Sequence, residues 1–247
     1  MKITHFKNKF NTKGFFIVKK FINSNFIDEI LHEIKNSKNV DIYYDRNNKI
    51  RRIEKIYDKG KFLKQLNSKF VDLIKKYLDH EVTIFKDKFN AKPPGGEGFS
   101  AHYDGIFKFS NKDGEEKNGW YHYGDFFLNV LLALDNCTEQ NGTIEIADSH
   151  SGDFNQLIKK TTLDGTPNLS EIEERKNKFE KINLDVGDLV IFKNTCPHRS
   201  DKNNSTSERR ILYYTYSSLK NGSKYQDYFN DKKNSKNKTR KSLSGKL

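Results

Sequence analysis

Two side chains that commonly bind metal ions lie two positions apart in the segment GFSAHYDGIF, where His102 is followed by Asp104. If this segment is extended, residues i and i+2 project from the same face, so both side chains can reach one ion. The pair alone is a weak signal, because a His-x-Asp spacing also arises by chance on protein surfaces. It predicts a metal site only if a further ligand comes from elsewhere in the chain.

His198 is the candidate for that further ligand. It lies in the segment TCPHRS, directly after the apolar run VGDLVIFKN at residues 186–194. Two histidines and one carboxylate leave coordination positions open, which is typical of Fe(II) sites that take a cosubstrate and O₂, whereas four closed ligands would indicate structural zinc. We therefore predict an Fe(II) site at His102, Asp104 and His198. The remaining histidines are interpreted as ordinary core or surface residues: His5, His32, His80, His122 and His150.

The elements that must position these ligands are mostly short strands. After residue 80, β-branched or aromatic runs alternate with turn residues, at 81–92, 125–134, 142–147, 186–194 and 209–218. Earlier in the chain, a strand is predicted at 14–22 and helices at 24–37 and 61–80, the first of them capped by Ser24 or Asn25. Many short strands without regular βαβ alternation predict a mainly β fold with flanking helices, a sandwich or jelly roll.

The segment HRSDKNNSTSER resembles the distal motif of the phytanoyl-CoA dioxygenase family. Five positions match that motif in register, and they are His198, Ser200, Asn203, Ser205 and Arg209. Upstream, AKPPGGEGFSAHYD resembles the Lys-Pro stretch that precedes the family's His-x-Asp, and LLALDNCTEQNGTIEIADSH resembles its segment with Ala-Leu, Asn-Gly and Ser-His. The resemblance runs from about residue 10 to residue 218.

The resemblance implies a double-stranded β-helix, cupin-like, with iron at the three ligands named above and 2-oxoglutarate as cosubstrate. It places Arg209 at the far carboxylate of 2-oxoglutarate, with Ser200 beside it. A guanidinium suits this role because it offers a carboxylate two parallel hydrogen bonds, which a lysine cannot. Arg210 is the competing residue, since it faces the opposite way on the same strand. Lys92 matches a cosubstrate-side lysine of the family, although a lysine before Pro-Pro can equally be solvated.

The implied reaction consumes O₂ and 2-oxoglutarate, releases succinate and CO₂, and hydroxylates a substrate. Related enzymes that halogenate have a small residue in place of the aspartate, so the presence of Asp104 favours hydroxylation. Two departures from the family pattern, at Leu131 and at residues 147–150, put in doubt a close relation to the members that act on acyl-CoA. We expect an enzyme, and interpret a non-enzymatic jelly-roll binding module as the weakest alternative.

The sequence indicates the identity of the substrate less clearly than the type of reaction. Residues 105–125 are predicted to form a variable loop over the mouth of the site, with aromatic side chains that either contact substrate or only close the site. Lys92, Lys108 and the mildly basic body favour a small polar or anionic metabolite, such as an organic acid, an amino acid derivative or an organophosphonate. An alternative is an oxygenase acting on a peptide or nucleic acid.

Net charge is concentrated near the end of the 247-residue chain. The formal charge is +12, and residues 218–247 contain nine lysines or arginines against two aspartates. We therefore divide the chain into a dioxygenase domain with N-terminal helices at residues 1–220 and a basic C-terminal tail at residues 221–247. Such a tail is more often solvated than a nucleic-acid arm, so no nucleic-acid partner is expected.

The remaining features concern the compartment. No stretch approaches about 18 consecutive apolar residues, and the first residues lack the apolar run of a secretory signal, so we expect no membrane contact. Cys137 and Cys196 are too few for a disulfide framework and are predicted to be buried free thiols. These features favour a cytoplasmic enzyme. The last three residues, Gly-Lys-Leu, match a peroxisomal signal only imperfectly, and the oligomeric state stays open.

Overall fold

The computed structural model describes residues 3–111 and 113–234. The helices within these ranges are α1 Ile3–Thr12, α2 Ser24–Asn36, α3 Lys61–Leu78, α4 Phe154–Ile158, α5 Glu171–Lys176 and α6 Tyr225–Asn234, with 3-10 turns at Gly119–His122 and Leu219–Asn221. The strands are β1 Phe15–Val18, β2 Asp41–Tyr44, β3 Ile50–Glu54, β4 Val82–Lys92, β5 Phe99–His102, β6 Phe109–Ser110, β7 Glu116–Lys117, β8 Phe127–Ala133, β9 Ile144–Ile146, β10 Glu180–Lys181, β11 Leu189–Lys193, β12 His198–Ser200 and β13 Arg209–Ser218.

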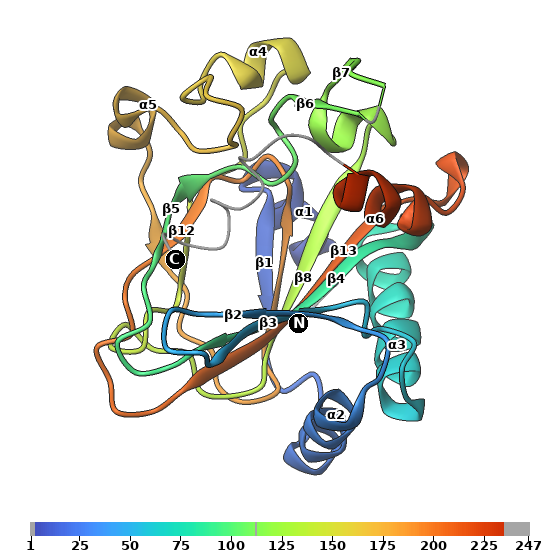
Figure 1. Cartoon of the computed structure of the whole chain (residues 1–247), viewed down its shortest axis with the longest axis vertical. Coiled ribbons are helices and arrows are strands. Elements are labelled where there is room, and N and C mark those ends of the chain that lie inside the picture. Colours follow the sequence, from blue (N-terminus) through green and yellow to red (C-terminus); the bar gives the residue numbers. More distant parts are fainter. Residues whose placement is uncertain (1–2, 112, 235–247) are drawn as a thin grey trace.

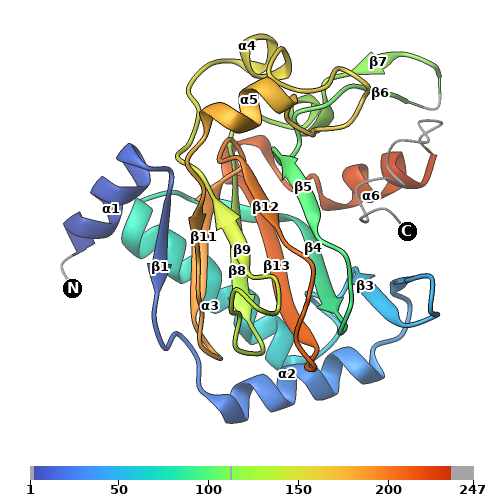
Figure 2. The same cartoon turned by 90° about the vertical axis from the view of Figure 1, so that its left-hand side faces the viewer.

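Two antiparallel sheets form the body of the molecule (Figure 1). The larger sheet has seven strands in the order β1-β11-β8-β13-β4-β3-β2, and the smaller has four in the order β10-β9-β12-β5. Figure 2 shows helix α3 behind the larger sheet and strands β9, β12 and β5 in front of it. Helices α4 and α5 and the hairpin β6–β7 lie together beyond one end of the sheets. This arrangement agrees with the predicted jelly roll with flanking helices.

Side chains alternate between two cores along the central strands, because successive strand residues point to opposite faces. On β13, Leu212, Tyr214 and Tyr216 belong to the apolar core shared with the helices. Their neighbours Ile211 and Tyr213 instead belong to the core between the two sheets. The parity of a residue on β13 therefore decides whether its side chain can reach the interior of the jelly roll.

The predicted helices are present, with one difference at a boundary. Helix α2 is capped by Asn23, whose side-chain oxygen accepts a hydrogen bond from the backbone N–H of Phe26 at 3.0 Å. The predicted cap at Ser24 or Asn25 is therefore wrong, because both residues already lie inside the first helical turn. Helix α3 packs the predicted apolar face against the larger sheet, with six of its residues buried.

The predicted C-terminal tail at residues 221–247 is wrong for the part that the structure describes. Residues 225–234 form α6, in which the aromatic side chains of Tyr225, Tyr228 and Phe229 are buried. The Tyr225 hydroxyl donates a hydrogen bond to Oδ1 of Asp87 at 2.7 Å, and Lys232 forms an ion pair with the buried Glu54. High charge did not prevent burial, because Tyr225 and Lys232 find polar partners on β4 and β3. Residues 235–247, with the imperfect peroxisomal signal, lie outside the described residues.

One further expectation is met, because Cys137 and Cys196 are free and buried. Among the helices that the structure describes, none combines the length and apolar character needed to span a bilayer.

Candidate active site

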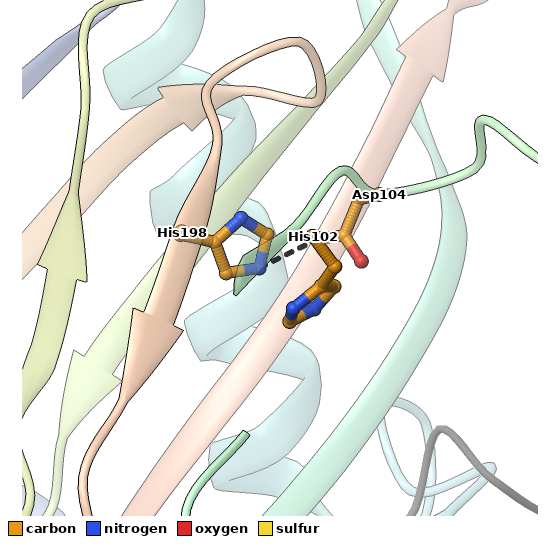
Figure 3. Close-up of side chains that lie close together, drawn as sticks. All are labelled: His102, Asp104 and His198. Carbon is orange, nitrogen blue, oxygen red and sulfur yellow. Dashed lines mark ion pairs between the residues drawn. The ribbon is translucent and has the colours of Figure 1, made fainter. Parts of the chain in front are cut away.

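Strands β5 and β12 bring the three predicted metal ligands together. The two strands are antiparallel neighbours, and His198 lies directly opposite His102. Asp104 follows His102 by two residues, so its side chain leaves the same face. The ligand atoms of the three residues all lie within 4.8 Å of one another. Figure 3 shows the three side chains converging, and the dashed line joins His198 Nε2 to Asp104 Oδ2 over 3.7 Å.

Backbone carbonyl groups orient both imidazole rings. Nδ1 of His102 lies 2.7 Å from the carbonyl oxygen of Ser100, and Nδ1 of His198 lies 3.1 Å from that of Cys196. A carbonyl only accepts, so each Nδ1 carries the proton and each Nε2 keeps a free lone pair. This is the usual arrangement of histidines that bind a metal through Nε2.

A buried chain of amides and a hydroxyl fixes Asp104. Asn129 Nδ2 donates a hydrogen bond to Asp104 Oδ2 at 2.9 Å, and Asn129 Oδ1 accepts one from the Thr215 hydroxyl at 2.8 Å. The Asn194 side chain also donates to the Asp104 backbone oxygen at 3.2 Å. Because Asn129 and Thr215 are held on central strands β8 and β13, the carboxylate has a defined position before any metal binds.

The protonation states of the three residues suit metal binding. Burial, reinforced by the neighbouring His198, lowers the pKa of His102 to about 3, and burial also lowers the pKa of His198. Burial acts in the opposite direction on Asp104, but the charges of His198, Lys88 and Lys86 outweigh it and lower its pKa to about 2. At neutral pH the site therefore offers two neutral imidazoles and one carboxylate, a donor set that fits Fe(II).

Arg209 lies in the same cavity as the three ligands, as its strand parity predicts. Its side chain is buried, with the residue only 3% exposed, and its Nε has no hydrogen-bond partner. No carboxylate forms an ion pair with it within residues 3–111 and 113–234. A buried guanidinium without a counter-ion is costly, so this group is suited to receive an anionic ligand.

The neighbouring Arg210 faces away from the cavity. Its Nε and Nη2 bind the two oxygens of Asp135 at 2.8 and 2.7 Å, and a third of its side chain is exposed. The structure thus separates the two arginines as the predicted alternation requires.

Ser200 and Lys92 are the other two predicted cosubstrate residues, and they differ in whether they line the cavity. Ser200 lines it, whereas Lys92 does not, although Lys92 is directly opposite Arg209 in the β4–β13 register. Lys92 is fully buried, and its Nζ donates hydrogen bonds to the Ser200 hydroxyl at 2.9 Å, to Gly142 O at 3.2 Å and to Asp201 O. The solvated alternative for Lys92 is therefore excluded, and this lysine contacts two residues that line the cavity, Ser200 and Phe99.

The loop at 105–125 contributes part of the cavity wall. Gly105, Phe107 and Trp120 line the cavity, and Trp120 is buried. Lys108, which the sequence favoured as a substrate-side cation, is exposed and forms an ion pair with Glu116 at 2.6 Å instead of lining the cavity. The aromatic side chains of this loop are thus structural as well as available to a substrate.

The sequence interpretation missed the wall formed by β3, β4 and α6. The polar residues of this wall are Arg52, Glu54, Lys86, Lys88, Asn90 and Lys232. A signal was present in β4, where the polar residues of KDKFNAK alternate as they would on one face of a strand. Without the fold, however, nothing indicated that this face points toward the metal ligands.

Comparisons with known proteins identify the family to which the chain belongs. The family model for phytanoyl-CoA dioxygenase (PhyH) matches residues 10–211. The chain is 30% identical over 165 residues to a 2-aminoethylphosphonate dioxygenase from uncultured bacterium HF130_AEPn_1, covering 65% of this chain and 55% of that protein. It is 28% identical over 153 residues to a methylphosphonate hydroxylase from Gimesia maris, covering 62% and 52%. The aligned region thus spans about half the length of these relatives.

A solved structure supports the fold. The structure of EctD from S. alaskensis with 2-oxoglutarate and 5-hydroxyectoine superposes with a TM-score of 0.68 at 17% identity, covering 90% of this chain and 77% of that one. At this identity the likeness concerns the jelly-roll fold, which confirms the predicted fold class.

Proposed function

Because the chain belongs to the phytanoyl-CoA dioxygenase family, we propose that it is an Fe(II)- and 2-oxoglutarate-dependent dioxygenase that hydroxylates a small anionic metabolite. The observation that carries the proposal is the meeting, in one cavity, of a His-Asp-His ligand set and a buried arginine that has no counter-ion among the described residues. A structural metal site would not need the arginine, and a binding module would not need ligands with open positions.

In this proposal, His102 and His198 bind iron through Nε2 and Asp104 binds it through its carboxylate. Iron, when bound, supplies the activation of O₂ that couples decarboxylation of 2-oxoglutarate to substrate oxidation. The protein groups orient the ligands and shield the site from solvent. Asn129 and Thr215 hold Asp104 in position, and Trp120 in the cavity wall limits the access of water to the site. Since Asp104 occupies the third ligand position, hydroxylation is favoured over halogenation.

Arg209 is proposed to bind the far carboxylate of 2-oxoglutarate, with Ser200 donating beside it. Lys92 orients Ser200, because its Nζ donates to the Ser200 oxygen and leaves the Ser200 proton available for an anionic acceptor. These roles rest on burial and on the shared cavity of Arg209 and Ser200.

For the substrate, we favour an organophosphonate among the small anionic metabolites. The two relatives described above are named for 2-aminoethylphosphonate and methylphosphonate. The cavity also has more cationic than anionic side chains, which suits an acidic substrate.

Anaerobic titration tests the metal and cosubstrate parts separately. Purified protein with Fe(II) should develop a weak visible charge-transfer band on addition of 2-oxoglutarate, and His102→Ala or His198→Ala should remove it. An unchanged band in both variants would exclude the ligand assignment. Small phosphonates, carboxylates and amino acid derivatives are then screened aerobically for substrate-dependent succinate release, and release by a macromolecule alone would refute the small-molecule assignment.

A further inference from the structure

One wall of the cavity contains a cluster of cationic side chains beyond those assigned to iron and 2-oxoglutarate. Arg52 comes from β3, Lys86 and Lys88 from β4, and Lys232 from α6. The only carboxylate on this wall among the described residues is Glu54. The wall is therefore positively charged even after Glu54 is counted.

Glu54 already has two cationic neighbours. Its Oε1 lies 3.6 Å from Arg52, and its Oε2 forms an ion pair with Lys232. The charges of Lys232 and Arg52 outweigh the effect of burial and lower the pKa of Glu54 to about 2, so it is ionised at neutral pH. Glu54 therefore offsets the charges of Arg52 and Lys232, and neither Lys86 nor Lys88 forms an ion pair with a carboxylate of the described residues.

Lys86 and Lys88 lie two residues apart on β4, so both side chains leave the same face of the strand. Each is partly buried and lies over an aromatic ring. Nζ of Lys88 is 4.3 Å from the ring centroid of Tyr213, and Nζ of Lys86 is 4.8 Å from that of Trp120. Within the described ranges 3–111 and 113–234, neither ammonium group makes a hydrogen bond or an ion pair. Two adjacent, partly desolvated cations without an acceptor are unfavourable unless a ligand supplies one.

The position of these lysines separates them from the cosubstrate end. Lys92 is opposite Arg209 in the β4–β13 register, whereas Lys88 is opposite Tyr213. Four residues of strand correspond to about 13 Å, so Lys88 and Arg209 belong to different ends of the cavity. Lys88 nevertheless lines the same cavity as Asp104 and His198. An anion held by Lys88 would thus lie beside the metal ligands without occupying the proposed 2-oxoglutarate site.

We propose that Lys86 and Lys88 form the subsite that binds the acidic group of the substrate, and that this group is a tetrahedral dianion of the phosphonate type. The inference rests on the proposed function. Two ammonium groups suit a head group with two charges and three acceptor oxygens, and the two Nζ atoms already lie over the rings of Trp120, Tyr213 and Tyr228, which limit their positions. Lys86 and Lys88 are thus specificity-determining residues, while the three metal ligands and Arg209 determine the chemistry.

Binding of methylphosphonate to the anaerobic complex with Fe(II) and 2-oxoglutarate tests this subsite. The perturbation of the visible band reports the dissociation constant, without any turnover. Lys86→Met and Lys88→Met keep the side-chain length and remove the charge, and Lys108→Met is the matched control outside the cavity. We expect each cavity variant to weaken methylphosphonate binding by about tenfold or more, and the control by less than about twofold.

The same experiment distinguishes failure of the subsite from failure of the proposed function. In the two cavity variants, the band formed with 2-oxoglutarate alone should keep its intensity and midpoint. A normal band with unchanged methylphosphonate affinity in a Lys86→Met/Lys88→Met double variant would overturn the subsite and leave the dioxygenase proposal intact. Loss of the band in the wild-type protein would overturn the dioxygenase proposal itself.

Two further ligands test the chemical class. Methanesulfonate has the same shape with one charge and should bind about tenfold more weakly than methylphosphonate, so equal binding would overturn the dianion assignment. Inorganic phosphate should compete with methylphosphonate for the same lysines, but only a phosphonate with a C–H bond should release succinate under O₂. If phosphate and methylphosphonate bind together without competition, the lysines are not their common site.

Discussion

Replacement of Arg209 by methionine should weaken the binding of 2-oxoglutarate without lowering the stability of the metal-free protein. Arg209 is almost fully buried, its Nε makes no hydrogen bond, and no carboxylate pairs with it among residues 3–111 and 113–234. Loss of a charge-assisted, two-pronged contact to a buried carboxylate costs about 2 to 5 kcal/mol. The dissociation constant for 2-oxoglutarate should therefore rise by about 30-fold to several thousand-fold.

The free protein should respond differently. Burial lowers the pKa of Arg209, which means that the folded state disfavours its charged form when no anion is present. Methionine fills a similar volume without a charge, so Arg209→Met should leave the urea midpoint of the metal-free protein unchanged or higher.

Arg210→Met is the control on the same strand. This change removes the ion pair with Asp135, which is partly exposed, so it should lower stability by at most about 1 kcal/mol and change the 2-oxoglutarate affinity by less than about twofold. Both variants are measured by anaerobic titration of the visible band and by urea unfolding. A larger loss of affinity in Arg210→Met than in Arg209→Met would refute the assignment of the cosubstrate ligand, and no loss in either would remove 2-oxoglutarate from this cavity.

Three other changes test the surroundings of the site. Phe229→Ala should lower the free energy of unfolding by about 3 to 5 kcal/mol in urea titrations, because the ring is buried against the body, and a loss below about 1 kcal/mol would restore the interpretation of residues 225–234 as a solvated segment. Asn129→Leu should weaken Fe(II) binding by about 10- to 100-fold in anaerobic competition with a chelator, because Asp104 loses its orienting donor; unchanged affinity would show that Asn129 only packs. Burial raises the pKa of Asp87 from 3.8 to about 6, so its contribution to stability is complete below about pH 4 and is lost as the pH rises through 6. In the wild type this loss should lower the unfolding free energy by up to about 3 kcal/mol between pH 4 and 7. Asp87→Asn introduces a side chain that cannot ionise and should therefore remove this fall, whereas an unaltered profile would mean that Asp87 is not the group that titrates.

The grouping of His102, Asp104 and His198 was predictable because it depends on two local rules. The alternation of side chains on an extended segment places His102 and Asp104 on one face, and the apolar run before His198 indicated a strand that ends at the same rim. The same alternation predicts that Arg209 and Arg210 point to opposite faces of their strand. Rules of this kind hold whenever the segment is extended, whatever the remainder of the fold does.

The cationic wall of the cavity was not predictable, because it depends on how distant elements pack. Lys86 and Lys88 alternate on a strand, but strand β4 has two buried faces and the sequence does not say which face meets the metal ligands. Helix α6 was overlooked because its charged residues outnumber its aromatic ones. The aromatic residues nevertheless lie at i, i+3 and i+4, at Tyr225, Tyr228 and Phe229, which is the spacing of a single helical face. Charge content thus predicted exposure where spacing predicted burial, and spacing was the better guide.

The pairing of β1 with β11 has a consequence for how the protein is made. Residues 15–18 find their partner strand only in residues 189–192, so the larger sheet stays incomplete until most of the chain has left the ribosome. Contacts between such distant residues form slowly, and in the meantime the apolar segment FFIV is available to associate with other chains. We therefore expect the yield of folded protein during expression to improve when translation is slowed by cooling.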